Sequence, residues 1–189
     1  MHFVESAEIA YNLQKLAIKV SFFKESFYKA FFCAFLTDNE FFLVIAIDID
    51  PKKIEMARHN AKIYGVEDKI DFLVGDFFDL VESIKADIVF LSPPWGGPSY
   101  MKYDTTYDLE EMLLPVSASK LMEATRKITQ DIVMYLPRNS NTNQLAVLAG
   151  PKNSVEIEQN FLDRKLIAIT AYYGKLVQNN IMKWWSFLT

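Results

Sequence analysis

Three apolar runs, each followed at once by polar or turn-forming residues, dominate the middle of the chain. They are Leu43–Ile47, Ile70–Val74 and Ala86–Leu91. Continuous apolar runs rich in β-branched residues are typical of parallel strands that are covered on both faces. Because the carboxyl ends of parallel strands meet at one edge of a sheet, the polar residues after these runs are expected to form a ligand crevice.

Helices and further strands are predicted around these runs. Asp50 followed by Pro51 favours a helix start, and Gly65 favours its end in a left-handed C-cap. We expect helical spacing over 6–20 and a helix over 118–127, and we leave the Phe-rich stretch 22–42 open between helix and strand. The remaining predicted strands are Asp131–Leu136 and the two arms of an antiparallel hairpin, Val155–Phe161 and Lys165–Tyr173.

A mostly parallel sheet that ends in an antiparallel hairpin predicts an α/β chain with the class I, Rossmann-like methyltransferase fold. We expect one domain over 1–189. It would comprise a divergent N-terminal part with an atypical first strand and loop (1–42), a core (43–174) and a C-terminal tail (175–189).

Composition narrows the class of protein. The net charge of −4 over 189 residues argues against a protein that tracks along duplex nucleic acid, although it allows recognition of one nucleotide. Charged residues interrupt 22–42, so no membrane span is expected, and no metal site is expected either. The single cysteine, Cys33, excludes an internal disulfide and is more readily explained by burial than by catalysis.

Six segments resemble the methyltransferase domain of the trimethylguanosine synthase family. They are Val44–Pro51, Gly75–Phe77, Phe90–Pro98, Leu136–Asn139, Leu148–Pro151 and Val155–Phe161. The resemblance implies transfer of methyl groups from S-adenosylmethionine to N2 of 7-methylguanosine. The substrates would be capped small nuclear and nucleolar RNAs, and the location would be nuclear, with a possible cytoplasmic pool.

Three residues are candidates for binding the cofactor. Asp48 ends the first apolar run, where a carboxylate suits acceptance from two ribose hydroxyls; a solvated helix-start carboxylate is the alternative. The resemblance implies that Asp76 accepts from the adenine amino group and that Phe77 lines the ring.

The sequence Ser92-Pro93-Pro94-Trp95 is the candidate reaction site. An exocyclic guanine amine is a poor nucleophile, so acceptors that orient it toward the methyl donor would supply catalysis by alignment. Ser92 and the carbonyl of Pro93 are the candidate acceptors, and the consecutive prolines, including Pro94, would hold them still. Trp95 would stack on the cationic 7-methylguanine ring, since tryptophan is the best aromatic face for a cation; core packing is its alternative.

Arg138 follows another predicted strand and is a candidate for contact with the cap phosphates. A surface arginine paired with a nearby acid is the competing interpretation. For Trp184 and Trp185 we expect helix packing.

The chain departs from the family in its N-terminal part. The family has a glycine-rich cofactor loop after the first strand, but here Lys29–Asn39 stands at the expected place and no glycine precedes Gly65. Ser6 stands where the family has a cofactor-contacting threonine. We therefore expect weakened cofactor binding. Two alternatives stay open: a non-catalytic cap-binding or protein-interaction module, and an amine methyltransferase that acts on another planar nitrogen.

Overall fold

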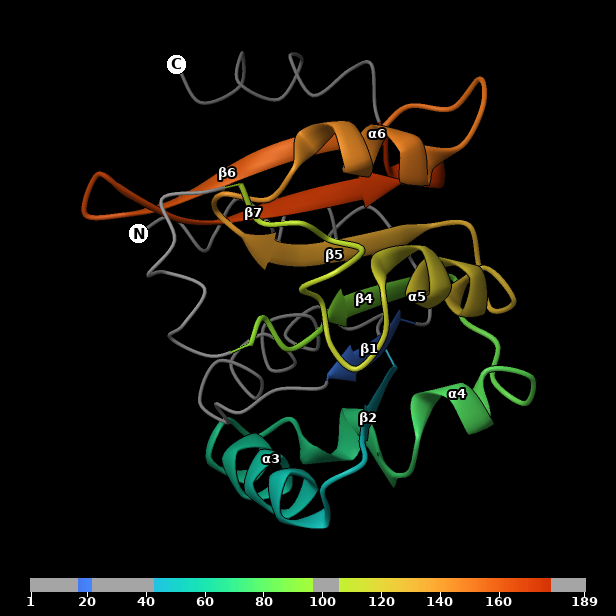
Figure 1. Cartoon of the computed structure of the whole chain (residues 1–189). Helices are drawn as coiled ribbons and strands as arrows, with labels where there is room; N and C mark the ends of the chain where they lie inside the picture. Colours follow the sequence, from blue (N-terminus) through green and yellow to red (C-terminus); the bar gives the residue numbers. More distant parts are fainter. Residues whose placement is uncertain (1–16, 22–42, 97–105, 178–189) are drawn as a thin grey trace, which may run out of the picture.

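The computed structural model describes residues 17–21, 43–96 and 106–177, whose strands form one seven-stranded sheet. The strand order is β3-β2-β1-β4-β5-β7-β6 (Figure 1). The strands are β1 (Ala17–Ser21), β2 (Val44–Asp48), β3 (Ile70–Val74), β4 (Ile88–Ser92), β5 (Ile132–Pro137), β6 (Glu156–Leu162) and β7 (Lys165–Tyr173). β1 to β5 pair in parallel, and β7 runs antiparallel to both β5 and β6. The predicted parallel sheet with a terminal hairpin is confirmed.

Helices connect the strands. They are α3 (Pro51–Ile63), α4 (Phe77–Leu80), α5 (Ala118–Thr125) and α6 (Thr142–Ala149), with short 3₁₀ turns η1 (Glu67–Lys69) and η3 (Gly174–Leu176). The predicted start of α3 is confirmed, because the Asp50 side chain accepts from the backbone N–H of Lys52 at 3.0 Å and Pro51 is the first helical residue. Gly65 has φ +68° just after the helix, which is the conformation predicted for it.

The first strand corrects the sequence prediction. Helical spacing was expected over 6–20, but Ala17–Ser21 is a strand paired with β2 on one side and β4 on the other. Ladder pairing on both sides outweighs a weak local pattern. The connection from β1 to β2 therefore begins at Phe22, before the Lys29–Asn39 segment at which the sequence analysis placed the cofactor loop. The Lys29–Asn39 segment lies outside the described residues.

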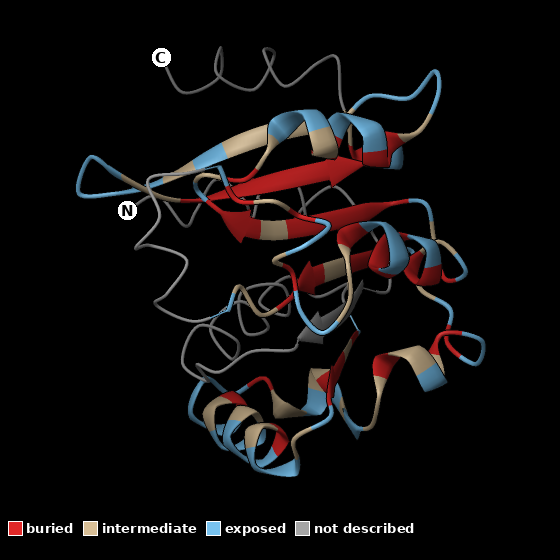
Figure 2. Cartoon of the chain, in the orientation of Figure 1, coloured by how far each residue is buried: buried red, intermediate tan, exposed pale blue. Residues whose placement is uncertain are grey.

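The two faces of the sheet carry different cores. On one face α4, α5 and α6 pack on alternate strand residues such as Leu91, Met134 and Leu136 in the larger buried cluster. On the other face Val133, Tyr172 and Leu176 form a smaller cluster. Figure 2 shows β4, β5 and β7 largely buried while the outer sides of the helices are exposed. Because both faces of β4 and β5 are covered, their sequences are continuous apolar runs, as predicted.

Arg126, at the end of α5, holds the neighbouring helix. Its guanidinium donates to the carbonyl of Leu148 at 2.6 Å and more weakly to that of Ala149 at 3.4 Å, at the C-terminal end of α6. A cation suits this position, because the last carbonyls of a helix lack intrahelical partners and carry partial negative charge.

Replacing Arg126 with Met is expected to destabilise the fold by about 1 kcal/mol, the lower end for bonds to a charged group, since the guanidinium is partly exposed. Urea unfolding measures the effect, with exposed Lys120→Met on the same helix as the control. An Arg126→Met midpoint equal to that of the control would contradict this role.

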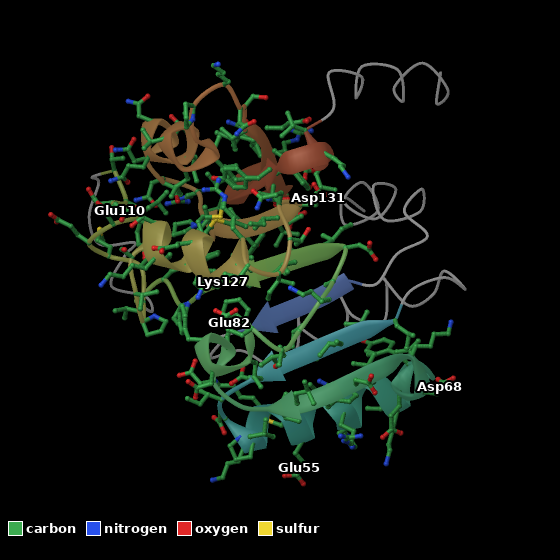
Figure 3. All side chains as sticks on the ribbon, turned by 90° about the vertical axis from the view of Figure 1, so that its right-hand side faces the viewer. Glu55, Asp68, Glu82, Glu110, Lys127 and Asp131 are labelled. Atoms are coloured by element: carbon green, nitrogen blue, oxygen red, sulfur yellow. The ribbon has the colours of Figure 1, made fainter. Side chains whose placement is uncertain are left out.

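An exposed ion pair joins the residues that follow α4 to those that follow α5. Lys127 Nζ lies 2.6 Å from Glu82 Oε1, and the two residues lie close together in Figure 3. The hydrogen bond to Lys127 lowers the pKa of Glu82, and the same bond raises the pKa of Lys127. Exposed pairs of this kind add little to stability.

None of the helices within 43–96 and 106–177 is long and apolar enough to cross a membrane.

Candidate functional site

The candidate residues from three parallel strands meet at one edge of the sheet. Register places Ser92 of β4 opposite Ser21 of β1, and Asp48 of β2 opposite Val74 of β3. The backbone N–H of Gly75 donates to the carbonyl of Asp48 at 3.1 Å, which fixes the start of the turn after β3 beside the end of β2. The arrowheads of β1, β4 and β5 point to the left in Figure 1, and this edge is where their carboxyl ends lie.

Asp48 is a buried carboxylate at the tip of β2, with 4% of its surface exposed. Its Oδ1 accepts from the backbone N–H of Asp50 at 2.9 Å and lies 3.7 Å from Lys53 Nζ in the first turn of α3. A solvated carboxylate, the alternative interpretation of Asp48, does not fit this burial. These contacts hold the Asp48 carboxylate at the carboxyl edge of the sheet, and its contact with ribose stays a prediction.

Lys53 was not predicted as a site residue. It stands five positions after Asp48, across a strand-to-helix junction whose geometry brings the two side chains together. The sequence signal was a lysine after an acid-rich strand end and a helix-starting proline, a pattern that is common at solvated helix starts.

Asp76 and Phe77 open α4 after β3. Asp76 Oδ1 accepts from the backbone N–H of Phe78 at 2.8 Å, so this carboxylate is the N-cap of the helix. Phe77 is 1% exposed and belongs to the larger core, with Phe78 edge-on to it at 5.6 Å between ring centroids. The structure thus gives both residues a role in folding, and their adenine contacts stay predictions.

The Ser92–Trp95 turn leaves β4 with Ser92 only 3% exposed and Pro93 buried. The carbonyl of Pro94 accepts from the backbone N–H of Leu114 at 3.3 Å. Trp95 is half-buried, and its indole Nε1 donates to the carbonyl of Tyr135 at 3.4 Å. The indole therefore lies at the border between core and surface.

A segment for which the sequence predicted no helix or strand ties this edge together. This strap, Tyr107–Leu114, bonds through the Tyr107 backbone to Asn139 and Asn141 just after β5, at 2.8 and 3.0 Å. The Tyr107 side chain is fully buried, and its hydroxyl donates to the carbonyl of Met112 at 2.9 Å. Together with the bond from Leu114 to Pro94, the strap joins the turn after β4 to the turn after β5.

Asp108 in the strap gives a pH-dependent contribution to stability. The side-chain amide of Gln144 and then the backbone N–H of Glu110 hold the pKa of Asp108 below its ordinary value of 3.8. Because the folded pKa is lowered, this stabilisation is present above the unfolded pKa and is lost as pH falls through the folded pKa.

Asp108→Asn is therefore expected to lower the free energy of unfolding at about pH 6 and to have a smaller effect at about pH 3. Urea unfolding of both proteins at the two pH values measures the difference. A variant whose deficit is the same at both pH values would contradict the assignment.

Arg138 follows β5 and is exposed. Its guanidinium donates to the carbonyl of Leu166 in β7 at 3.4 Å. This contact is with backbone, so it does not decide between the phosphate role and pairing with an acid.

Ser6, Cys33, Trp184 and Trp185 lie outside the described residues. Within the described ranges no group of three or more histidine, cysteine, aspartate or glutamate side chains is placed to hold a metal ion.

Comparison with known proteins shows the family of this chain. A family profile described as RNA cap guanine-N2 methyltransferase matches residues 11–176. Trimethylguanosine synthase of Schizosaccharomyces pombe is 36% identical over 137 residues, which cover 69% of this chain and 56% of that protein. The Saccharomyces cerevisiae trimethylguanosine synthase is 40% identical over 112 residues, 57% of this chain and 35% of that protein. The chain thus spans about half or less of the length of these curated relatives.

Solved structures share the fold at low sequence identity. The Bacillus subtilis M1A22 tRNA methyltransferase TrmK superposes with a TM-score of 0.59 at 14% identity, covering 92% of this chain and 65% of that one. The Mycoplasma capricolum TrmK, solved with S-adenosyl-homocysteine, gives a TM-score of 0.57 at 12% identity, covering 93% and 69%. The predicted class I methyltransferase fold is confirmed.

Proposed function

The chain belongs to the RNA cap guanine-N2 methyltransferase family, and from this premise we propose that it methylates N2 of 7-methylguanosine caps on small RNAs. S-adenosylmethionine is the proposed methyl donor. A nuclear location, with a possible cytoplasmic pool, is part of the same proposal and rests on the family alone. The description of 1–189 as one methyltransferase domain likewise rests on the family alone.

The observation that carries the proposal is the position of the Ser-Pro-Pro-Trp turn. It leaves β4, one strand away from β1 and two from β2, whose tip holds the buried Asp48. A carboxylate for ribose hydroxyls, acceptors for an amine and an indole for a cationic ring thus come from one edge of the sheet. This donor set fits a methyl donor that carries a nucleoside beside a cap guanine.

Asp48 would accept from the ribose hydroxyls, and Lys53, whose Nζ lies 3.7 Å from Asp48 Oδ1, would hold that carboxylate in place. Asp76 caps α4 with one oxygen, and its carboxylate has acceptor capacity for the adenine amino group. The residues between β1 and β2 contain no glycine, whereas the family's loop relies on glycine for close backbone approach. We propose that cofactor affinity is consequently weaker than the family's pattern would give.

Ser92 and the carbonyl of Pro93 would accept hydrogen bonds from the two N–H groups of the guanine amine and aim its lone pair at the methyl group. When bound, S-adenosylmethionine supplies an electrophilic methyl whose bond to sulfur breaks as the nitrogen–carbon bond forms. The nitrogen becomes cationic and then releases its proton to solvent, so no strong base is needed beforehand. Alignment by the rigid turn would supply most of the catalysis.

Trp95 would stack on the 7-methylguanine ring and select it by its positive charge. Arg138, exposed beyond the end of β5, would meet the cap phosphates, for which bidentate geometry favours arginine.

Two calorimetric titrations test the proposal, one with S-adenosylmethionine and one with 7-methylguanosine diphosphate. Binding of both ligands supports the enzyme, and weak cofactor binding supports the effect of the missing glycines. Binding of the cap nucleotide without the cofactor would contradict the enzyme and support the alternative of a non-catalytic cap-binding module. Binding of neither would overturn the proposal.

A further inference from the structure

One residue of β5 holds the Trp95 indole in two ways. The rings of Tyr135 and Trp95 lie 5.3 Å apart between centroids, at an interplanar angle of 35°. The backbone carbonyl of the same Tyr135 accepts from indole Nε1 at 3.4 Å. The first contact acts on the plane of the indole and the second on its edge, so together they define its orientation.

The position of Tyr135 follows from the sheet. Leu91 of β4 pairs with Met134 of β5, and Tyr135 is the next residue along β5, level with the start of the Ser-Pro-Pro-Trp turn. The strap fixes the turn from its other side, because the Pro94 carbonyl accepts from the backbone N–H of Leu114. Trp95 therefore has a set orientation before any ligand is present.

The ring distance shows how a planar ligand can use this indole. A purine held between two aromatic rings would keep them about 7 Å apart, since each contact needs about 3.5 Å. At 5.3 Å the Tyr135 and Trp95 rings are in contact with each other and do not form the two walls of a slot. A cap purine would thus contact the indole from outside this pair and not between the two rings.

We infer that Tyr135 is a positioning residue that determines specificity for the cationic purine by holding the indole at the stacking angle. The inference rests on the proposed function. Attraction between a cation and a ring depends on the cation lying over the ring face. Without the Tyr135 ring the indole would lose this fixed angle, and ordering it would reduce the free energy gained on binding.

Tyr135→Leu tests the inference because it removes the ring and keeps the backbone carbonyl. The measurement is the ratio of the dissociation constants for guanosine diphosphate and 7-methylguanosine diphosphate. We expect the ratio to fall about three- to tenfold, as for loss of an aromatic pair, with affinity for guanosine diphosphate nearly unchanged. Tyr135→Phe should keep the unmutated ratio, and so should Phe72→Leu, a half-buried aromatic control on β3.

An unmutated ratio in folded Tyr135→Leu would overturn the inference. Equal loss of affinity for both nucleotides would also overturn it, because that pattern indicates only a structural role. If the leucine protein does not fold, Tyr135→Met, whose flexible side chain fills irregular gaps, replaces it with the same expectations. A ratio near one in the unmutated protein would instead refute the proposed cap site, so the two failures are distinguishable.

Discussion

Asp48→Asn is expected to weaken binding of S-adenosylmethionine by about 10- to 100-fold, the effect of losing one hydrogen bond to a charged acceptor. Asparagine keeps the shape of the side chain and one acceptor oxygen, so the bond from the Asp50 backbone N–H can persist. The amide has lost the negative charge and presents N–H donors where a second hydroxyl would donate. Calorimetric titration of both proteins with the cofactor measures the loss.

Asp50→Asn is the matched control for this substitution. Asp50 lies two residues further along and caps α3, a role that asparagine fills equally well. The control should therefore bind the cofactor as the unmutated protein does. Equal weakening in the two variants would mean that Asp48 has no special role in cofactor binding.

Trp95→Ala should lower the preference for 7-methylguanosine diphosphate over guanosine diphosphate by about 1–2 kcal/mol, or about 5- to 30-fold. The reason is that the positive charge of the methylated ring gains from an indole face, while both nucleotides share every other contact. Trp95→Phe should give an intermediate preference, because phenylalanine offers a weaker face for a cation.

Fluorescence or calorimetric titration with both nucleotides measures the preference. Phe72→Ala on β3 is the matched control, since the Phe72 ring lies under the guanidinium of Arg58 in α3, 4.7 Å from the ring centroid. A Trp95→Ala protein with the unmutated preference would leave the indole without a part in recognition.

The apolar runs before Asp48, Gly75 and Ser92 were enough to predict the parallel sheet, because strands covered on both faces need continuous apolar sequence. The start of α3 could be predicted for the same kind of local reason, an N-cap acid followed by proline. The ends of these strands then placed the candidate residues on one edge, since that follows from parallel topology alone.

β1 could not be predicted, because its identity depends on pairing with β2 and β4 and not on its own pattern. The contacts of Lys53, Tyr135 and the strap were missed for a related reason. Each joins residues from different elements, and their side chains have ordinary alternative explanations in sequence. Asp76, predicted from the sequence to bind the cofactor, is the N-cap of α4, so the carboxylate that the resemblance singled out also satisfies a folding pattern.

The most direct test of the account is transfer of a labelled methyl group from saturating S-adenosylmethionine to capped dinucleotides, one with and one without the 7-methyl group on guanine. Saturating cofactor offsets the weak binding expected from the missing glycines. The account predicts label on N2 of the 7-methylated cap and far less on the unmethylated one. Equal labelling of the two caps, or labelling of neither, would contradict it.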